Sequence, residues 1–396
     1  MTATPAAVGA STTASGAGTA PAVSRNARPH LHGTELDALH AVLADGVFGH
    51  GPRTERFERE LARFLGVADV VAVATGTAAL HLALLAAGVG PGDEVVVPSQ
   101  TFCATVQAVL ATGAHPRFAE IDPDTLCVTA ATVRAALGPR TRAVVPVLYG
   151  GRAVDLADLH ELFDRRGITV VEDAAHAFGS HHGDRRVGGT GLLTCFSFDP
   201  VKNLTCGEGG AVVPRTPEDA RRVRRLRGLA IDADHRDRAR STGYTVTGFG
   251  MRAHLPALNA ALGLAQLAGF DLVADRRDRL WRAYRDRLGE LALPDRVRLV
   301  DLDIDHTVPF HCVVRVPDRD RVFHCLQARG IGVGVHYPPN HLQPAFADWH
   351  TPLPVTEATG VEILSLPLHP ALTVDDVDTV VTALHDVLRT TSGALP

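Results

Sequence analysis

Short apolar runs alternate with helical stretches through the first half of this 396-residue chain, and this pattern limits the folds open to it. The runs expected to form strands are 70–74, 94–98, 143–147, 168–171, 192–198 and 210–213. The stretches expected to form helices between them include 78–87, 101–112 and 155–166. This order is typical of βαβ units, so we expect a mostly parallel central sheet with helices on both faces.

The pattern changes after about residue 215. Residues 218–227 are arginine-rich and expected to be helical, 232–245 read as a long polar loop, and 254–272 read as one long apolar helix. The C-terminal part mixes the two kinds of element, at 309–315, 319–329, 332–337 and 364–368. The last helix is expected to begin at Thr373, with Asp376 completing a capping box. We therefore predict a large domain over 25–253 and, over 254–396, a linking helix with a smaller α+β domain.

Composition excludes several classes of protein. The net charge of −5 argues against a nucleic-acid binder, and no run of about 18 apolar residues predicts a membrane span. Residues 1–24 are mostly Ala, Thr, Ser and Gly, which predicts a disordered tail and not a secretory signal. The six cysteines lack zinc-ligand spacing, so we expect free thiols in a reducing cytoplasm. No metal is expected at the C-terminal histidines, which also lack ligand spacing: His311, His324, His336 and His341.

The chain contains 38 arginines but a single lysine, Lys202. A surface cation tolerates exchange of lysine for arginine, because only its charge matters there. A Schiff base does not tolerate it, because the bond needs a primary amine that can lose its proton, and a guanidinium stays protonated. Lys202 is therefore a candidate for covalent amine chemistry, although an accident of composition would leave the same count.

Three further features fall at the carboxyl ends of the expected strands, where open α/β sheets place their ligands. Gly76 and Thr77 open a helix, whose free amides suit a phosphate or simply a capped helix start. Asp173 ends a buried strand, where it could pair with a protonated ring nitrogen or merely cap a helix. Ser197 lies five residues before Lys202, as a phosphate ligand or as a strand-end hydroxyl. Together with Lys202, these residues indicate a site for pyridoxal 5′-phosphate (PLP).

From about residue 51 to 383 the chain resembles the DegT/DnrJ/EryC1/StrS family of PLP-dependent sugar aminotransferases, a branch of the fold-type I transferases. The resemblance rests on the order of several motifs: Gly51-Pro-Arg-Thr-Glu-Arg-Phe-Glu58, Thr75-Gly-Thr-Ala-Ala-Leu80, Gly90-Pro-Gly-Asp-Glu-Val95, Pro98-Ser-Gln-Thr-Phe102, Glu172-Asp-Ala-Ala-His-Ala177, Ser197–Gly210, Val335-His-Tyr-Pro338 and Leu364-Ser-Leu-Pro367. Each motif is modest alone, but this order is specific.

The resemblance implies a role for each matching residue. Lys202 binds the cofactor and shuttles the proton, and Asp173 pairs with the pyridine nitrogen. Phe102 stacks on the ring, and His176 lies near the ring hydroxyl. Phosphate contacts are implied for Gly76, Thr77 and Ser197, a further cofactor contact for Asn203, and substrate contacts for Arg252, His336 and Tyr337. PLP and its pyridoxamine form are the implied cofactors, in a homodimer with shared active sites.

Two positions depart from the family pattern. Gly250 stands where the family has an asparagine that reaches the partner subunit's phosphate, and Leu148 takes the place of a frequent sugar-facing histidine. These departures put the cross-subunit contact in doubt and suggest an unusual acceptor.

Several functions remain open from the residues alone. The leading hypothesis is transfer of an amino group from Glu or Gln to a keto sugar, nucleotide-linked as in most relatives, in amino-sugar or secondary-metabolite biosynthesis. One alternative is a cyclitol ketone as acceptor. Another is a PLP-dependent dehydratase, but family members that deoxygenate sugars replace the lysine by histidine. A non-catalytic subunit would be expected to lose Lys202 or Asp173, and both are present.

Overall fold

The computed structural model describes residues 22–232, 242–291 and 296–390, and a seven-stranded sheet forms its centre. The strands lie in the order β1-β9-β8-β5-β4-β2-β3. Only β9 runs antiparallel to its neighbours, and the remaining pairs are parallel. The strands span Val71–Val73 (β1), Glu94–Pro98 (β2), His115–Ala119 (β3), Thr141–Val144 (β4), Thr169–Asp173 (β5), Leu193–Ser197 (β8) and Gly210–Val213 (β9).

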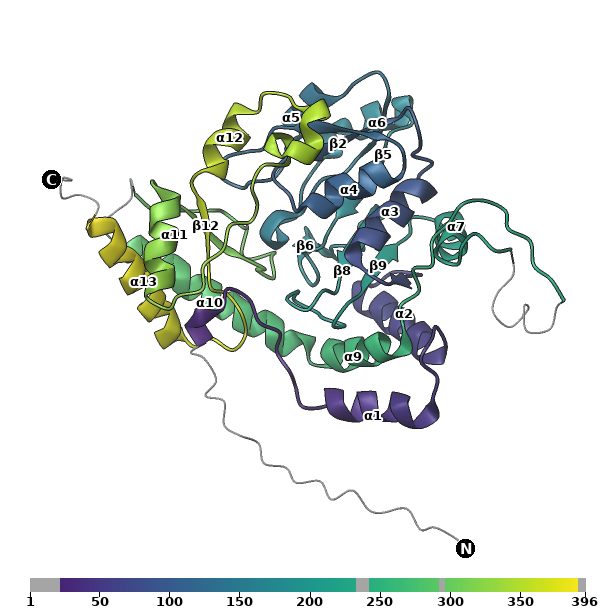
Figure 1. The fold of residues 1–396 in the computed structure, drawn as a ribbon, viewed down its shortest axis with the longest axis horizontal. Helices are drawn as coiled ribbons and strands as arrows, with labels where there is room; N and C mark the ends of the chain where they lie inside the picture. Colours follow the sequence, from purple (N-terminus) through teal and green to yellow (C-terminus); the bar gives the residue numbers. More distant parts are fainter. Residues whose placement is uncertain (1–21, 233–241, 292–295, 391–396) are drawn as a thin grey trace, which may run out of the picture.

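Helices cover both faces of this sheet (Figure 1). One face carries α3 (Gly76–Ala86), α4 (Cys103–Ala111) and α7 (Pro217–Arg227). The other face carries α2 (Pro52–Leu65), α5 (Ala130–Ala136), α6 (His160–Arg166) and α9 (Ala257–Ala268), while α1 (Glu35–Asp45) packs on α9. Because strand side chains alternate between faces, Val170 and Val171 of β5 join the two different cores. The predicted fold class, a fold-type I architecture, is confirmed.

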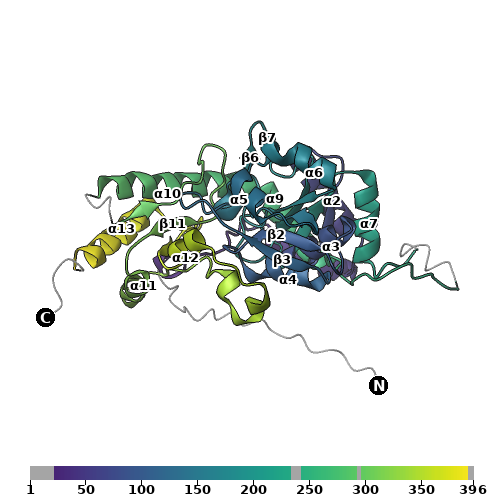
Figure 2. The ribbon, with the colours of Figure 1, turned by 90° about the horizontal axis from the view of Figure 1, so that it is seen from above.

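A second, smaller unit is built on a three-stranded sheet in the order β10-β11-β12. Its strands are Arg298–Leu299 (β10), Cys312–Arg315 (β11) and Ile363–Leu366 (β12). Helices α10 (Phe270–Glu290), α11 (Arg319–Ala328) and α13 (Val374–Arg389) share its apolar core, and α12 (Pro354–Gly360) lies between β11 and β12 along the chain. The helix α10 runs from the large sheet to this unit (Figure 2).

The structure corrects several expectations. The single helix expected over 254–272 is broken at Gly269 into α9 and α10, which meet at 61°. Residues 22–24 form a short 3₁₀ helix whose Val23 carbonyl accepts from Gly332, so they belong to the folded part and not to a tail reaching residue 24. Most of the tail (1–21) and most of the loop expected over 232–245 (233–241) lie outside the described residues.

Other elements were missed or overestimated. Strand β3 was not predicted, because Pro116 and Arg117 interrupt its apolar run, and the hairpin of β6 (His181–His182) and β7 (Arg185–Arg186) was also missed. The segment 332–337 forms only an isolated bridge, between Gly334 and Ser365. Across the described ranges no single helix is long and apolar enough to cross a membrane, although the bent pair α9–α10 passes the length and composition test jointly.

Candidate active site

A cavity of about 310 Å³ opens at the carboxyl ends of the central strands, between the large sheet and the smaller unit. Its walls come from the starts of α3 and α4, the ends of β5 and β8, and segments 310–311 and 336–337. Nine of the residues selected from the sequence line it: Gly76, Thr77, Phe102, Asp173, His176, Ser197, Lys202, His336 and Tyr337. The chain therefore brings together residues as far apart as Gly76 and Tyr337, which are 261 positions apart.

Lys202 lies in the turn that follows β8, where its amide donates to the Asp199 carbonyl at 3.1 Å. Its ammonium nitrogen sits 4.5 Å from the centre of the Phe310 ring. Loss of hydration lowers the pKa of Lys202 to about 8, while Asp199 and Asp173 oppose that shift. The amine can thus lose its proton close to neutral pH, as a nucleophilic amine must.

Asp173 ends β5 with its carboxylate buried and held by two donors. The Thr105 hydroxyl donates to Oδ2 at 2.7 Å, and the Ala175 amide donates to Oδ1 at 3.2 Å. Burial raises the pKa of Asp173, and the bond from Thr105 is the largest effect in the opposite direction. A buried carboxylate held in this way is suited to pair with a cationic partner in the cavity.

His176 and Tyr337 form a polar pair on another wall of the cavity. The Gly150 amide donates to His176 Nδ1 at 3.4 Å, so Nε2 carries the proton and donates to the Tyr337 hydroxyl at 3.1 Å. Burial, with Lys202 nearby, holds the pKa of His176 well below its usual value. The imidazole is therefore neutral and can direct a hydrogen bond toward a bound group through Tyr337.

His336 and His311 stack beside this pair, with ring centres 4.2 Å apart. His336 Nδ1 bonds the Ser365 hydroxyl at 2.8 Å, and its carbonyl accepts from the Tyr149 hydroxyl. Burial lowers the pKa of His336 to about 4 and that of His311 well below its usual value. These histidines add polar surface to the cavity without adding charge.

The start of α3 forms a cradle for an anion. Thr75 caps the helix by accepting from the Ala78 amide at 3.0 Å, which leaves the first helical amides, at Gly76 and Thr77, directed at the cavity. A Cβ at position 76 would lie 2.6 Å from the Ser197 Cβ, so only glycine lets the helix approach that serine so closely. The cradle thus combines helix amides with the two hydroxyls of Thr77 and Ser197.

Two of the predicted contact residues lie elsewhere in this chain. Asn203 is buried behind Lys202 and donates to the Val308 carbonyl at 3.2 Å, outside the cavity wall. Arg252 lines a different cavity, of about 1080 Å³, beside α2 and α7. Their predicted roles, a cofactor contact and a substrate contact, stay predictions.

The two departures from the family pattern have structural explanations. A Cβ at Gly250 would lie 2.4 Å from the Leu226 carbonyl oxygen, so the backbone after α7 leaves no room for an asparagine there. The side chain of Leu148 is fully buried in the core and does not line the Lys202 cavity, so it carries no contact with an acceptor there.

Sequence reasoning missed several residues that shape the site. Thr105 orients Asp173 from the first turn of α4, and Phe310 enters from the segment before β11. Nothing in their local sequence marks them, because each reaches the cavity only through the packing of distant elements. His311 and His336 were considered as metal ligands, and the described residues contain no group of three or more side chains that could hold a metal ion.

The site fits the group that the sequence suggested. The cavity is large enough for a small cofactor, and its walls carry an anion cradle, a buried carboxylate on a strand end and a deprotonatable amine. Fold and site together define a fold-type I transferase of the PLP-dependent kind.

Comparison with known proteins identifies the family. A model of the DegT/DnrJ/EryC1/StrS aminotransferase family matches residues 29–385, so the chain belongs to this family of PLP-dependent aminotransferases. The aminotransferase TlmJ from Streptoalloteichus hindustanus is 37% identical, with 93% of this chain and all of that one covered and a TM-score of 0.86. DesV of S. venezuelae, solved with a ketimine intermediate, is also 37% identical, with coverages of 91% and 95% and a TM-score of 0.82. DesI, solved in the presence of its TDP-sugar product, is 33% identical, covers 93% of each chain and has a TM-score of 0.82.

Proposed function

We propose that this protein uses PLP to move an amino group from Glu or Gln to a nucleotide-linked keto sugar, in the biosynthesis of an amino sugar or secondary metabolite. The observation that carries the proposal is the convergence of Lys202, Asp173 and the α3 amide cradle on one cavity. The family match supports sugar amination, and the TDP-sugar product of DesI supports a nucleotide-linked acceptor. The free cysteines agree with a reducing cytoplasm as the place of action.

Each residue of the chain has a distinct task in this reaction. When bound, PLP supplies an aldehyde for amines and a ring that accepts electrons. The α3 amides with Thr77 and Ser197 hold the phosphate, and Phe102 covers the ring face. Asp173 keeps the ring nitrogen protonated, and Tyr337 with His176 directs a hydrogen bond to the ring hydroxyl. Lys202 would move the proton between the donor carbon and the cofactor, because its lowered pKa suits it to both taking and giving a proton.

The first test is the absorbance spectrum of the purified protein with PLP, before and after addition of glutamate or glutamine. We expect a yellow band that bleaches with one of the two donors. A protein that stays colourless with added PLP would refute the proposal. If both donors bleached the band at equal rates, the result would support the use of PLP but contradict the expectation that the protein uses only one of the two donors.

The acceptor is tested separately. A donor-loaded protein is mixed with a TDP-linked keto sugar, with the same sugar lacking the nucleotide, and with a cyclitol ketone, and the return of the yellow band is followed. We expect the nucleotide-linked sugar to react fastest. Faster reaction of the cyclitol ketone would establish the alternative acceptor, and elimination of water without amine transfer would establish a dehydratase.

We further propose that two copies of this chain assemble with shared active sites, which would give Arg252 its predicted contact. The cavity around Arg252 is bordered by Phe48, which is 50% exposed, and Phe249 nearby in sequence is 98% exposed. Such exposed aromatic side chains are typical of a covered interface. Light scattering should show a dimer, and mixing Lys202→Ala with Arg252→Ala chains should restore part of the activity. Absence of restoration in a proven mixed dimer would exclude a shared site.

A further inference from the structure

A buried guanidinium lies behind the Lys202 cavity. Arg277 of α10 is 1% exposed, and one of its terminal nitrogens donates to the carbonyls of Pro309, Phe310 and Leu368 at 3.3 Å each. Within the described ranges no carboxylate lies within ion-pair distance of it. Burial lowers the pKa of Arg277 to about 9, so the side chain keeps its charge at neutral pH. An unpaired buried charge is expensive for a fold, which calls for an explanation.

Arg277 and Lys202 are linked by the ring of Phe310. The Lys202 nitrogen is 4.5 Å from the ring centre and the Arg277 guanidinium carbon is 5.8 Å from it. The two cationic centres are therefore no further apart than the sum of these distances. His176 stacks on the same ring at 4.4 Å, so Phe310 is held between the catalytic cavity and α10.

The other groups around Lys202 either attract its positive charge or are neutral. Asp199 and Asp173 favour the protonated amine, and Glu208 also lines the cavity. Burial keeps the three neighbouring histidines neutral: His176, His311 and His336. Burial is the main cause that lowers the pKa of Lys202, and Arg277, a cation that the described residues place near these carboxylates, acts in the same direction.

We propose that Arg277 is a positioning residue for the reaction: acting across the Phe310 ring, its charge adds to burial in favouring the unprotonated amine of Lys202 whenever that amine is not bonded to the cofactor. This inference rests on the catalytic role proposed for Lys202. This role explains why an arginine without an ion-pair partner stands at a buried position of α10, although other positions of the same helix, such as Arg279, are exposed to solvent. Two unit charges roughly 10 Å apart at an effective dielectric constant of about 20 shift a pKa by about one unit.

The single lysine makes this shift measurable without cofactor. In the apoprotein, the rate of acetylation by acetic anhydride is followed against pH, and peptide mass spectrometry separates Lys202 from the other amines, including the one that Arg277→Lys adds. Arg277→Gln and Arg277→Met remove the charge, Arg277→Lys keeps it, and Arg279→Gln is the matched control on an exposed position of α10. Thermal unfolding establishes that each variant is folded.

We expect the apparent pKa of Lys202 to rise by about one unit in the two neutral variants, which is a tenfold loss of free amine below that pKa. It should stay near the original value in Arg277→Lys and Arg279→Gln. An unchanged Lys202 pKa in a folded neutral variant would overturn the proposal. Failure of both neutral variants to fold would also overturn it, in favour of a structural role. Because no PLP is present, these outcomes are independent of whether the aminotransferase proposal holds.

Discussion

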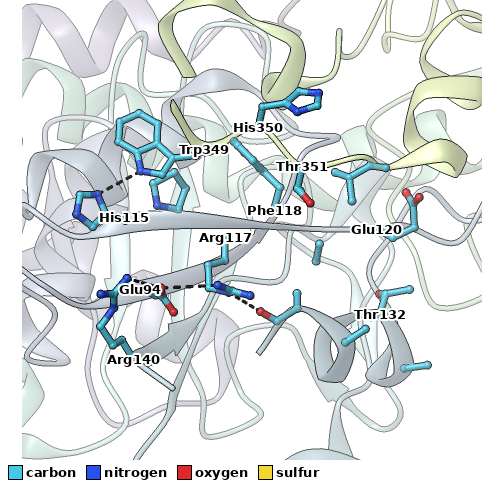
Figure 3. A pocket seen from close by; sticks show the side chains of 16 residues that line it. Glu94, His115, Arg117, Phe118, Glu120, Thr132, Arg140, Trp349, His350 and Thr351 are labelled. Atoms are coloured by element: carbon cyan, nitrogen blue, oxygen red, sulfur yellow. Dashed lines mark hydrogen bonds and ion pairs between the residues drawn. The ribbon is translucent and has the colours of Figure 1, made fainter. Parts of the chain in front are cut away.

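Two concave regions of this molecule both contain charged residues, but they differ in volume and in how those charged residues are paired. The Lys202 cavity has a volume of about 310 Å³, whereas a groove along the edge strand β3 has about 670 Å³. In the groove, His115 and Trp349 lie on one side of the strand, and Glu94, Arg117 and Arg140 lie on the other (Figure 3). The groove along β3 is the larger of the two, but neither the family resemblance nor the chemistry of its residues indicates an active site there.

The difference lies in how the charges are used. In the groove, charged and polar side chains pair with one another: Arg140 donates to one carboxylate oxygen of Glu94 at 2.8 Å, and the Trp349 indole donates to His115 at 3.2 Å. In the cavity Lys202 and Asp173 are desolvated and share no direct ion pair, and their pKa values move toward neutrality. The volume of a concave region is therefore a poor indicator of an active site, whereas several titratable groups that converge on one cavity with shifted pKa values are a good one.

The sharpest test of this comparison is removal of the amine. Lys202→Ala should abolish transamination, by at least about a thousandfold, because no other lysine can replace it. Turnover is measured as keto acid formed from the donor. Substantial steady-state turnover without an added amine would refute the assignment of Lys202.

The second test compares the two faces of one strand. Asp173→Asn should retain some PLP but lower the rate by about a hundredfold, the scale of a broken buried charge pair. Glu172→Gln is the matched control, because Glu172 is the adjacent residue, equally buried, and bonds Thr194 away from the cavity. Equal rates for the two variants would contradict the role of Asp173 in holding the ring nitrogen.

Glu172 itself provides a test of stability against pH. Burial raises the pKa of this carboxyl from 4.5 to about 7, so the folded state binds its proton more tightly than the unfolded state. The associated stability is present below about pH 4.5 and is lost as the pH rises through 7. Denaturant unfolding should therefore show that the free energy of unfolding of the parent protein falls relative to that of Glu172→Gln between pH 5 and 8, by on the order of 3 kcal/mol. A constant difference across this range would mean that Glu172 is ionised throughout.

The smallest effect is expected in the groove. Arg140→Ala removes a partner that is 65% exposed, so the free energy of unfolding should fall by less than about 1 kcal/mol. Arg117 remains near Glu94 at 3.7 Å, and the rate of amine transfer should be unchanged. A clear loss of activity in this variant would connect the groove with the reaction and break the comparison.

Residues close together in the sequence were predictable because local rules govern them. The alternation of apolar runs predicted six strands of the large sheet, and two of them, 94–98 and 210–213, match in full. The capping box of Thr373 and Asp376 is confirmed, because it depends only on a three-residue spacing. Strand β3 was missed because Pro116 and Arg117 interrupt its apolar run, and the break at Gly269 because glycine is tolerated inside an apolar helix.

The sequence by itself determined which residues have the chemistry for a cofactor site: the single lysine, the strand-end aspartate and the Gly-Thr helix start. Only the tertiary structure decided what surrounds them. Thr105 reaches Asp173, and Phe310 separates Lys202 from Arg277, because elements remote in the chain pack together. Reactivity depends on desolvation and on the distance between charges, and these are properties of the packed interior that no short segment of sequence contains.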